Sequence, residues 1–213
     1  MVRLQVFIFR KLWYNQNNKC ICKEPVTMRK NFGAQPFLYP MPVLIIASYD
    51  ENGVPNAMNA AWGCIADMNR VAIYVAGAHK TMANILARGA FTVSMADADH
   101  VVEADYVGIV SGNDVPDKLE RAGLHTTKSE FVDAPVIDEL PMALECQLVS
   151  FDEESELLIG EIVNVCADER ILNADGRIDP EKLNPITYDP VNHAYLTLGS
   201  KVGNAFSDGA KLK

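Results

Sequence analysis

The sequence predicts an antiparallel barrel or an α+β fold, made mainly of β-strands with inserted helices. Two observations carry this prediction. Short apolar runs rich in β-branched residues are bounded by Pro, Gly and Asp or Asn, and neighbouring runs are close enough to pair as hairpins. Helical patterns come between some strands, but they do not alternate with them regularly as they would in a doubly wound sheet.

The first predicted strands follow one another closely. Residues 43–49 form a short apolar run after Pro42, and the turn at 50–53 ends in a glycine that tolerates positive φ. The chain should then return as a second strand at about 54–63. A third strand covers 70–76.

A helix is expected to begin near Thr81. Its apolar positions are Met82, Ile85 and Leu86, and Gly89 stands where a helix of this length ends. The residues after this helix again form an apolar run that is typical of a strand.

The middle of the chain is more polar. After a strand at 91–96, an acidic helix is expected over 97–106. A second short helix is expected over 115–122, after the capping residue Asp114. Residues 124–141 look irregular, because two prolines limit any strand.

The last third contains a long hairpin, in which 142–151 pairs with 157–166. Gly160 lies inside the second of these strands and predicts a bulge or a close backbone approach. Residues 168–190 carry Asp-Pro and Asn-Pro turn signals. A final short strand is expected at 195–199.

Length and composition indicate an ordinary globular protein of one domain. The 213 residues are 49% hydrophobic and 22% charged. The net charge of −9 argues against a general nucleic-acid binder, which usually carries a basic surface. No apolar run approaches the length of a membrane span, so no membrane association is expected.

Residues 1–27 differ from the rest, with five basic residues against one acid. Their apolar piece at 6–9 is too short for a secretory signal. They are either a native basic arm or a leader, disordered or not native, ahead of a start at Met28. We favour the second interpretation and take 28–213 as the functional domain.

Five cysteines at irregular spacing form no CxxC pair and no zinc pattern. We interpret them as free thiols of a reducing cytoplasm. Two alternatives for a metal remain, at Cys20-Ile-Cys22 and among the acids around His100, but a solvated helix face explains the acids better. No metal site is therefore predicted.

Several common catalytic motifs are missing from the sequence. There is no GxGxxG, no GxxxxGK[ST], no GxSxG and no HExxH. These absences disfavour a Rossmann dinucleotide site, a P-loop, an α/β-hydrolase and a zinc protease. No catalytic residue is assigned.

A cluster of donors is expected at the start of the helix near Thr81. Lys80, Thr81 and Asn84 gather where unpaired backbone N–H groups and the positive end of the helix dipole favour an anion. On a preceding strand, small side chains before Trp62 would let a flat ring approach the backbone. The residues therefore predict a site for a phosphate-bearing aromatic cofactor.

Several motifs occur in a specific order along residues 30–210. They are Asn56-x-Met58-Asn59-x-Ala61-Trp62, Lys80-Thr81-x-x-Asn84-Ile85, Asp105-Tyr-Val-Gly108, Ser111-Gly112, Asp117-Lys118, Leu144-Glu-Cys146 and Ile159-Gly-Glu-Ile162. Together they resemble the FMN-binding split β-barrel of flavin reductase-like proteins. The flavoredoxin-like proteins are the subgroup that the sequence fits best.

The resemblance implies that residues 28–213 form an FMN-binding domain and that FMN lies in a groove near the interface of a homodimer. It implies that Asn56 and Trp62 lie beside the flavin, and that the donors at the helix start lie near the phosphate. The expected cofactor-binding residues are Asn56, Asn59, Ala61, Trp62, His79, Lys80, Thr81, Asn84 and Lys118.

Each of these residues also has a purely structural interpretation. Trp62 would otherwise be a core residue, Thr81 a helix cap and Asn59 a strand-end residue. Cys64 lies two residues beyond Trp62, and we interpret it as an inert buried thiol.

One departure from the family pattern concerns a histidine. Some relatives carry it just before the Ile-Gly-Glu-Ile strand, where this chain has Leu157 and Leu158. If that histidine assists the flavin, its role is missing here or is filled by His193.

Two functional hypotheses from different classes follow. The first is an FMN-dependent oxidoreductase in which NADH or NADPH reduces the flavin, which then reduces free flavin or an electron-accepting partner. The second is an FMN-holding electron carrier that has no nicotinamide site and serves a redox partner protein; its acidic surface would suit a basic partner. A split barrel that has lost its flavin is a third possibility.

Overall fold

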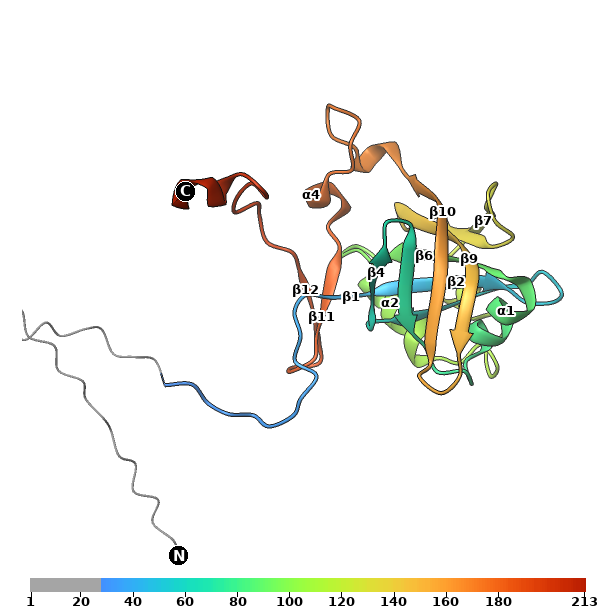
Figure 1. Cartoon of the computed structure of the whole chain (residues 1–213). Helices are drawn as coiled ribbons and strands as arrows, with labels where there is room; N and C mark the ends of the chain where they lie inside the picture. Colours follow the sequence, from blue (N-terminus) through green and yellow to red (C-terminus); the bar gives the residue numbers. More distant parts are fainter. Residues whose placement is uncertain (1–27) are drawn as a thin grey trace, which may run out of the picture. The chain divides into compact units, whose positions relative to one another are not determined.

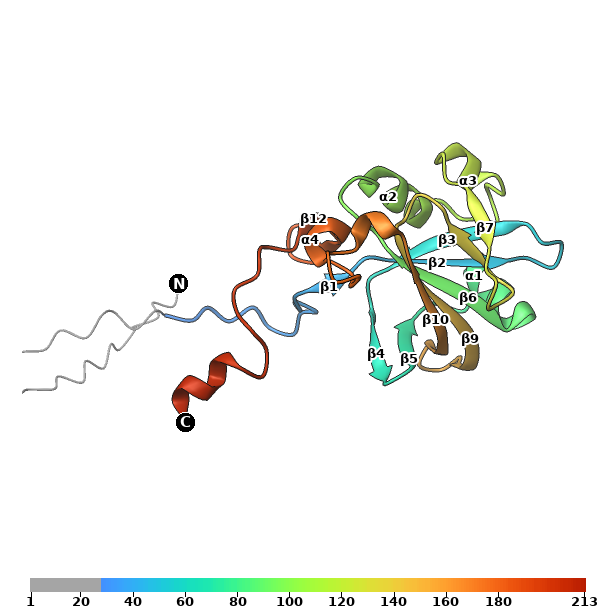
Figure 2. The same cartoon turned by 90° about the horizontal axis from the view of Figure 1, so that it is seen from above.

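A computed structural model describes residues 28–213, and the predictions made for residues 1–27 lie outside it. Residues 28–36 belong to a separate unit from Phe37–Lys213. The fold described below is that of the second unit, whose elements are shown in two views at right angles (Figure 1 and Figure 2).

One seven-stranded sheet organises the unit, and all its neighbouring strands are antiparallel. Its order in space is β3-β2-β6-β9-β10-β5-β4. The strands are β2 (Leu44–Tyr49), β3 (Pro55–Ala60), β4 (Gly63–Asp67), β5 (Arg70–Tyr74), β6 (Ala90–Met95), β9 (Met142–Asp152) and β10 (Leu157–Ala167). The sheet curls into a half-barrel, which confirms the predicted antiparallel β fold with inserted helices.

The remaining elements are short. One small antiparallel sheet contains β1 (Met41–Pro42), β11 (Ile186–Asp189) and β12 (Ala194–Thr197). A second contains β7 (Thr126–Lys128) and β8 (Pro135–Ile137). The helices are α1 (Lys80–Arg88), α2 (Val101–Ile109), α3 (Lys118–Arg121), α4 (Pro180–Leu183), η1 (Glu169–Ile171) and η2 (Asp208–Leu212).

The alternation of side chains along β2 divides the core into two clusters. Successive side chains of a strand point to opposite faces of its sheet. Leu44 and Ile46 therefore enter a cluster with residues of α1, whereas Ile45 and Ala47 enter a second cluster with residues of α2. Each face of the sheet is thus covered by one of the two longest helices.

Helix α1 forms where the sequence predicts it. Met82 and Ile85 are fully buried against the sheet, three positions apart as one face of a helix requires. Gly89 has φ +70° and its N–H donates to the carbonyl oxygen of Ile85 at 2.8 Å, so it ends the helix as expected. Leu86, the third apolar position, is about half exposed.

The predicted strand at 54–63 is wrong in its second half. Strand β3 ends at Ala60, and Gly63 begins the edge strand β4, which pairs with β5. A Cβ at Gly63 would lie 2.7 Å from Leu44 Cδ1, so a larger residue here would require the Leu44 side chain to shift. Cys64 on this edge strand is exposed, and the prediction of a buried thiol is therefore also wrong.

The polar middle segments contain more regular structure, and it is placed differently. The acidic helix begins at Val101 rather than 97, because the Asp97 carboxylate accepts the N–H groups of Asp99 and His100 in a turn before it. Of the helix expected over 115–122, only α3 forms. The strands β7 and β8 lie in the region expected to be irregular, and β11 lies in the region expected to be turns.

The expectation for Gly160 is confirmed in both of its parts. The register between β9 and β10 shifts between Ile159 and Gly160, as a bulge requires. A Cβ on Gly160 would lie 2.4 Å from Cζ and 2.9 Å from Cε1 of the fully buried Phe91. The glycine therefore lets β10 approach the centre of the core.

We expect Gly160→Ala to destabilise the fold by about 1–3 kcal/mol, because the new Cβ would force the fully buried ring of Phe91 to shift. Gly199→Ala is the matched control, since nothing lies within 4 Å of its Cβ position. Denaturant unfolding of both variants measures the difference. Equal stability of the two variants would contradict this account of the bulge.

Candidate functional site

The start of α1 offers backbone donors for an anion. The carbonyl oxygen of His79 accepts the N–H groups of Met82 and Ala83 at 3.0 and 3.2 Å, which fixes the first turn. The His79 side chain makes no capping hydrogen bond and is exposed. The first N–H groups of a helix have no partner within it, so they can donate to a bound anion.

A buried hydrogen bond joins α1 to β3. Asn56 Nδ2 donates to Thr81 Oγ1 at 2.7 Å, and the two residues are only 6% and 1% exposed. Thr81 therefore lies inside the helix and bonds to the sheet, so the interpretation of Thr81 as a helix cap is wrong. Its hydroxyl proton remains available as a donor, because its oxygen is the acceptor in this bond.

Two glycines bring the segment 107–112 against β3. A Cβ at Gly112 would lie 2.1 Å from Asn56 Oδ1, and a Cβ at Gly108 would lie 2.3 Å from the amide of Asn59. Asn59 Nδ2 in turn donates to the carbonyl oxygen of Ala104 in α2 at 3.0 Å. Both asparagines of the predicted motif thus have structural partners, and any larger side chain at the two glycines would push the segment away.

Lys118 is a buried lysine that holds the same segment from the other side. It is 2% exposed, and its Nζ donates to the carbonyl oxygens of Val107 and Val110 at 3.0 and 2.9 Å. Burial lowers the pKa of Lys118 to about 8. An ammonium group has three N–H donors, so one remains beyond these two bonds.

These elements enclose a cavity of about 230 Å³. Its lining includes five of the predicted cofactor-binding residues, together with the segment 107–112; the five are Asn56, His79, Lys80, Thr81 and Lys118. The structure therefore brings together residues that are far apart in the sequence. Their shared chemistry is that of hydrogen-bond donors and cations, which suits an oxyanion.

Asp50 is a charged neighbour of this cavity that the sequence analysis missed. Its Oδ2 lies 3.7 Å from Lys80 Nζ, and its Oδ1 accepts the N–H groups of Asn52 and Val54, both at 2.9 Å. These hydrogen bonds, that from Val54 most strongly, lower the pKa of Asp50. The signal in the sequence was the turn at 50–53, which was interpreted only as a turn.

The other predicted residues lie outside this cavity's lining. Asn84 is 4% exposed, and its Nδ2 makes no hydrogen bond to any described residue. Asn59 and Ala61 line a second, smaller cavity of about 140 Å³ with two tyrosines. Trp62 lies between β3 and β4 and is 57% exposed, so its interpretation as a core residue is wrong.

The two tyrosines of the smaller cavity hold polar partners. Tyr195 donates its hydroxyl to Asp105 Oδ1 at 2.7 Å, and burial followed by this bond raises the pKa of Tyr195 to about 12. The hydroxyl of Tyr188 lies 2.8 Å from His193 Nδ1. His193 therefore contacts Tyr188, and it is not among the residues that line the cavity at the start of α1.

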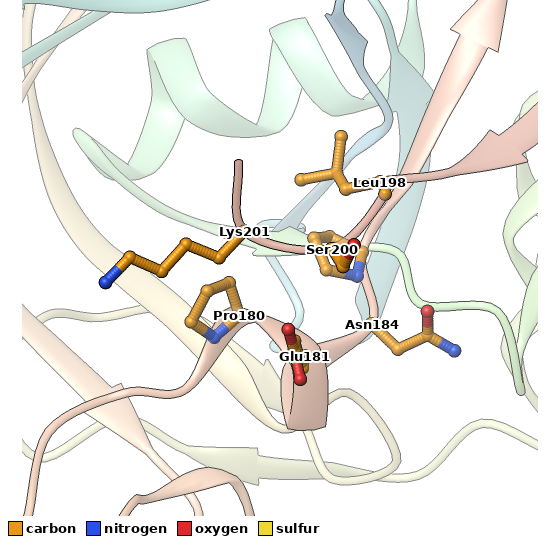
Figure 3. Close-up of a pocket in the computed structure, with 8 residues that line it drawn as sticks. Pro180, Glu181, Asn184, Leu198, Ser200 and Lys201 are labelled. Carbon is orange, nitrogen blue, oxygen red and sulfur yellow. The ribbon is translucent and has the colours of Figure 1, made fainter. Parts of the chain in front are cut away.

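A third cavity, of about 490 Å³, lies between α4 and the segment that follows β12 (Figure 3). Pro180 and Glu181 come from α4, whereas Leu198, Ser200 and Lys201 come from the later segment. No predicted site residue lines this cavity. Within residues 28–213, no group of three or more His, Cys, Asp or Glu side chains is arranged to hold a metal ion.

Comparison with known proteins identifies the family. The family model of the flavin reductase like domain matches residues 37–186, more than half of the chain. Flavoredoxin of Desulfovibrio vulgaris (Miyazaki F) is 38% identical, with a TM-score of 0.82 over 85% of this chain and 100% of that chain. Flavoredoxin from Methanosarcina acetivorans is 27% identical, with a TM-score of 0.79 over 87% and 100%.

A curated relative gives the same result. The uncharacterized protein YddH of Escherichia coli (strain K12) is 31% identical over 170 residues, which are 76% of this chain and 88% of that protein. The chain therefore belongs to the flavin reductase-like domain family, and its architecture is that of the FMN-binding split barrels. In the part of the chain that the structure describes, no helix is long and apolar enough to cross a membrane.

The depressed pKa of Lys118 predicts a pH dependence of stability. Its folded value of about 8 lies below the ordinary 10.5, so the unfolded chain holds more protons between these values. Stability should therefore rise with pH through this window, by on the order of 2–3 kcal/mol. Lys118→Met should lack this rise. Denaturant unfolding of both proteins from pH 7 to about 10.5 tests it, and parallel profiles would contradict the assignment.

Proposed function

We propose that this protein binds FMN and acts as an oxidoreductase, in which NADH or NADPH reduces the flavin and the flavin reduces free flavin or an electron-accepting partner. Membership of the flavin reductase-like family supports the flavin. The observation that carries the site is the donor-lined cavity at the start of α1, which we propose as the place of the FMN phosphate.

The residues present fit such a phosphate. Lys80 offers a charge, Thr81 a hydroxyl proton, and the first turn of α1 its backbone N–H groups. The buried Nδ2 of Asn84, one turn further along α1, lies outside the lining of the cavity and has no partner among residues 28–213, and we propose that it donates a hydrogen bond once FMN is bound. A phosphate monoester with up to two negative charges would satisfy several of these donors at once.

The flavin ring would lie outside this cavity, which at about 230 Å³ is smaller than the usual 300–1,000 Å³ of sites for organic ligands. The exposed indole of Trp62 supports a position for the ring along β3, because an aromatic face can pack against it. The small volume is consistent with a groove that a second copy of the chain completes. We propose such a homodimer, and we propose the cytoplasm as its location.

When bound, FMN would supply the hydride and electron chemistry, as flavins do in other proteins. The chain's own residues would bind and orient it. Asn56 would keep α1 and β3 together, Lys118 would hold the segment 107–112, and Lys80 with Thr81 would fix the phosphate.

A second candidate function is that of an FMN-holding electron carrier without a nicotinamide site. The similarity to two flavoredoxins favours it, and the acidic composition would suit a basic partner protein. Steady-state oxidation of NADH and NADPH by the flavin-loaded protein separates the two functions. Saturating turnover with either nucleotide supports the oxidoreductase, and its absence with both supports the carrier.

The phosphate position is tested by the double variant Lys80→Ala/Thr81→Ala. We expect FMN binding to weaken by about 2–4 kcal/mol, because two donors to a charged group are lost. Riboflavin, which lacks the phosphate, should bind the single variant Lys80→Ala nearly as well as the original protein, because this substitution keeps the hydrogen bond between Asn56 and Thr81. Lys128→Ala on β7 is the control for a lost surface cation, because this lysine is exposed and lines no part of the cavity. Unchanged FMN affinity in the double variant would contradict the assignment.

A further inference from the structure

The cation of the proposed phosphate site already has an anionic partner. Lys80 Nζ lies 3.7 Å from Asp50 Oδ2, and the two side chains are 33% and 15% exposed. Asp50 belongs to the turn between β2 and β3, whereas Lys80 begins α1. The pair therefore joins two elements at the edge of the cavity.

Asp50 is fixed in place by hydrogen bonds to its side chain and to its backbone carbonyl oxygen. Its Oδ1 accepts the N–H groups of Asn52 and Val54. Its carbonyl oxygen accepts from Arg88 Nε at 2.9 Å and from Arg88 Nη2 at 2.5 Å. The carboxylate thus cannot easily move away when an anion approaches Lys80.

We propose that Asp50 sets the affinity and charge selectivity of this site, by limiting how strongly it holds a phosphate dianion. The inference rests on the proposed function of the cavity as a phosphate site. The carboxylate cancels part of the positive charge of Lys80 and repels a second anion placed beside it. A flavin held by such a site would exchange more readily than one held by an unpaired lysine.

The substitution Asp50→Asn removes the negative charge of this side chain while keeping the hydrogen bonds that hold the turn. Asparagine keeps an Oδ1 that can accept the same two N–H groups, and the carbonyl bonded by Arg88 is unchanged. Asp50→Ser is a second variant, whose hydroxyl can also accept in such a turn. Glu51→Gln is the matched control, because it removes the same charge from the neighbouring exposed residue.

The first measurement compares the dissociation constants of FMN and riboflavin at about pH 7.5, where the phosphate is mainly a dianion. We expect Asp50→Asn to strengthen FMN binding by about 3- to 10-fold, since one nearby like charge is removed. Riboflavin binding should stay within about twofold in every variant, and Glu51→Gln should change FMN binding by less than about twofold.

The second measurement uses inorganic phosphate alone and follows the melting temperature against chloride at matched ionic strength. Phosphate should raise the melting temperature more in Asp50→Asn than in the original protein. FMN affinity that is unchanged or weaker in a variant that melts normally would overturn the inference, as would an equal gain in Glu51→Gln. If the original protein binds no FMN, the proposed function fails, and the phosphate comparison alone then decides the role of Asp50.

Discussion

The hydrogen bond from Asn56 to Thr81 is the interaction on which the geometry of the site depends. It is buried, so water does not compete for it, and removing either partner would leave the other unsatisfied at a cost of about 1–3 kcal/mol. The pairing of β2 with β3 sets Asn56 opposite Ser48, and the bond to Thr81 then fixes the start of α1 against that strand. Gly112 approaches the same asparagine, so strand, helix and loop meet at one side chain.

Each positive charge around this junction has a negatively charged or electronegative partner. Lys80 and Lys118 both line the cavity, but Lys118 is engaged by two carbonyl oxygens and Lys80 is paired with Asp50. The cavity is therefore less positive than its two lysines suggest. Its attraction for an anion depends as much on oriented donors, from the helix start and the hydroxyl of Thr81, as on net charge.

Sequence reasoning succeeded where a pattern is local. The period of α1, its end at Gly89 and the long β9–β10 hairpin are confirmed because short-range spacing and turn residues specify them. It failed at β4, β7, β8 and β11, because strands of three to five residues are too short to show a periodic pattern of apolar residues. The site shows the same division. Motifs in the sequence were enough to single out Lys80, Thr81 and Asn56. The pairing of Lys80 with Asp50 and the burial of Lys118 arise only from the tertiary fold, and no spacing rule shows them.

The central claim is that the cavity at the start of α1 serves a flavin phosphate, and the visible absorption spectrum of the purified protein tests it most directly. The released cofactor would be identified by its mass. The account predicts a yellow protein that carries about one FMN per chain, or that takes up added FMN to that ratio with a change in the flavin spectrum. A colourless protein that takes up no added FMN would contradict the proposed function and would leave only the fold and the family standing.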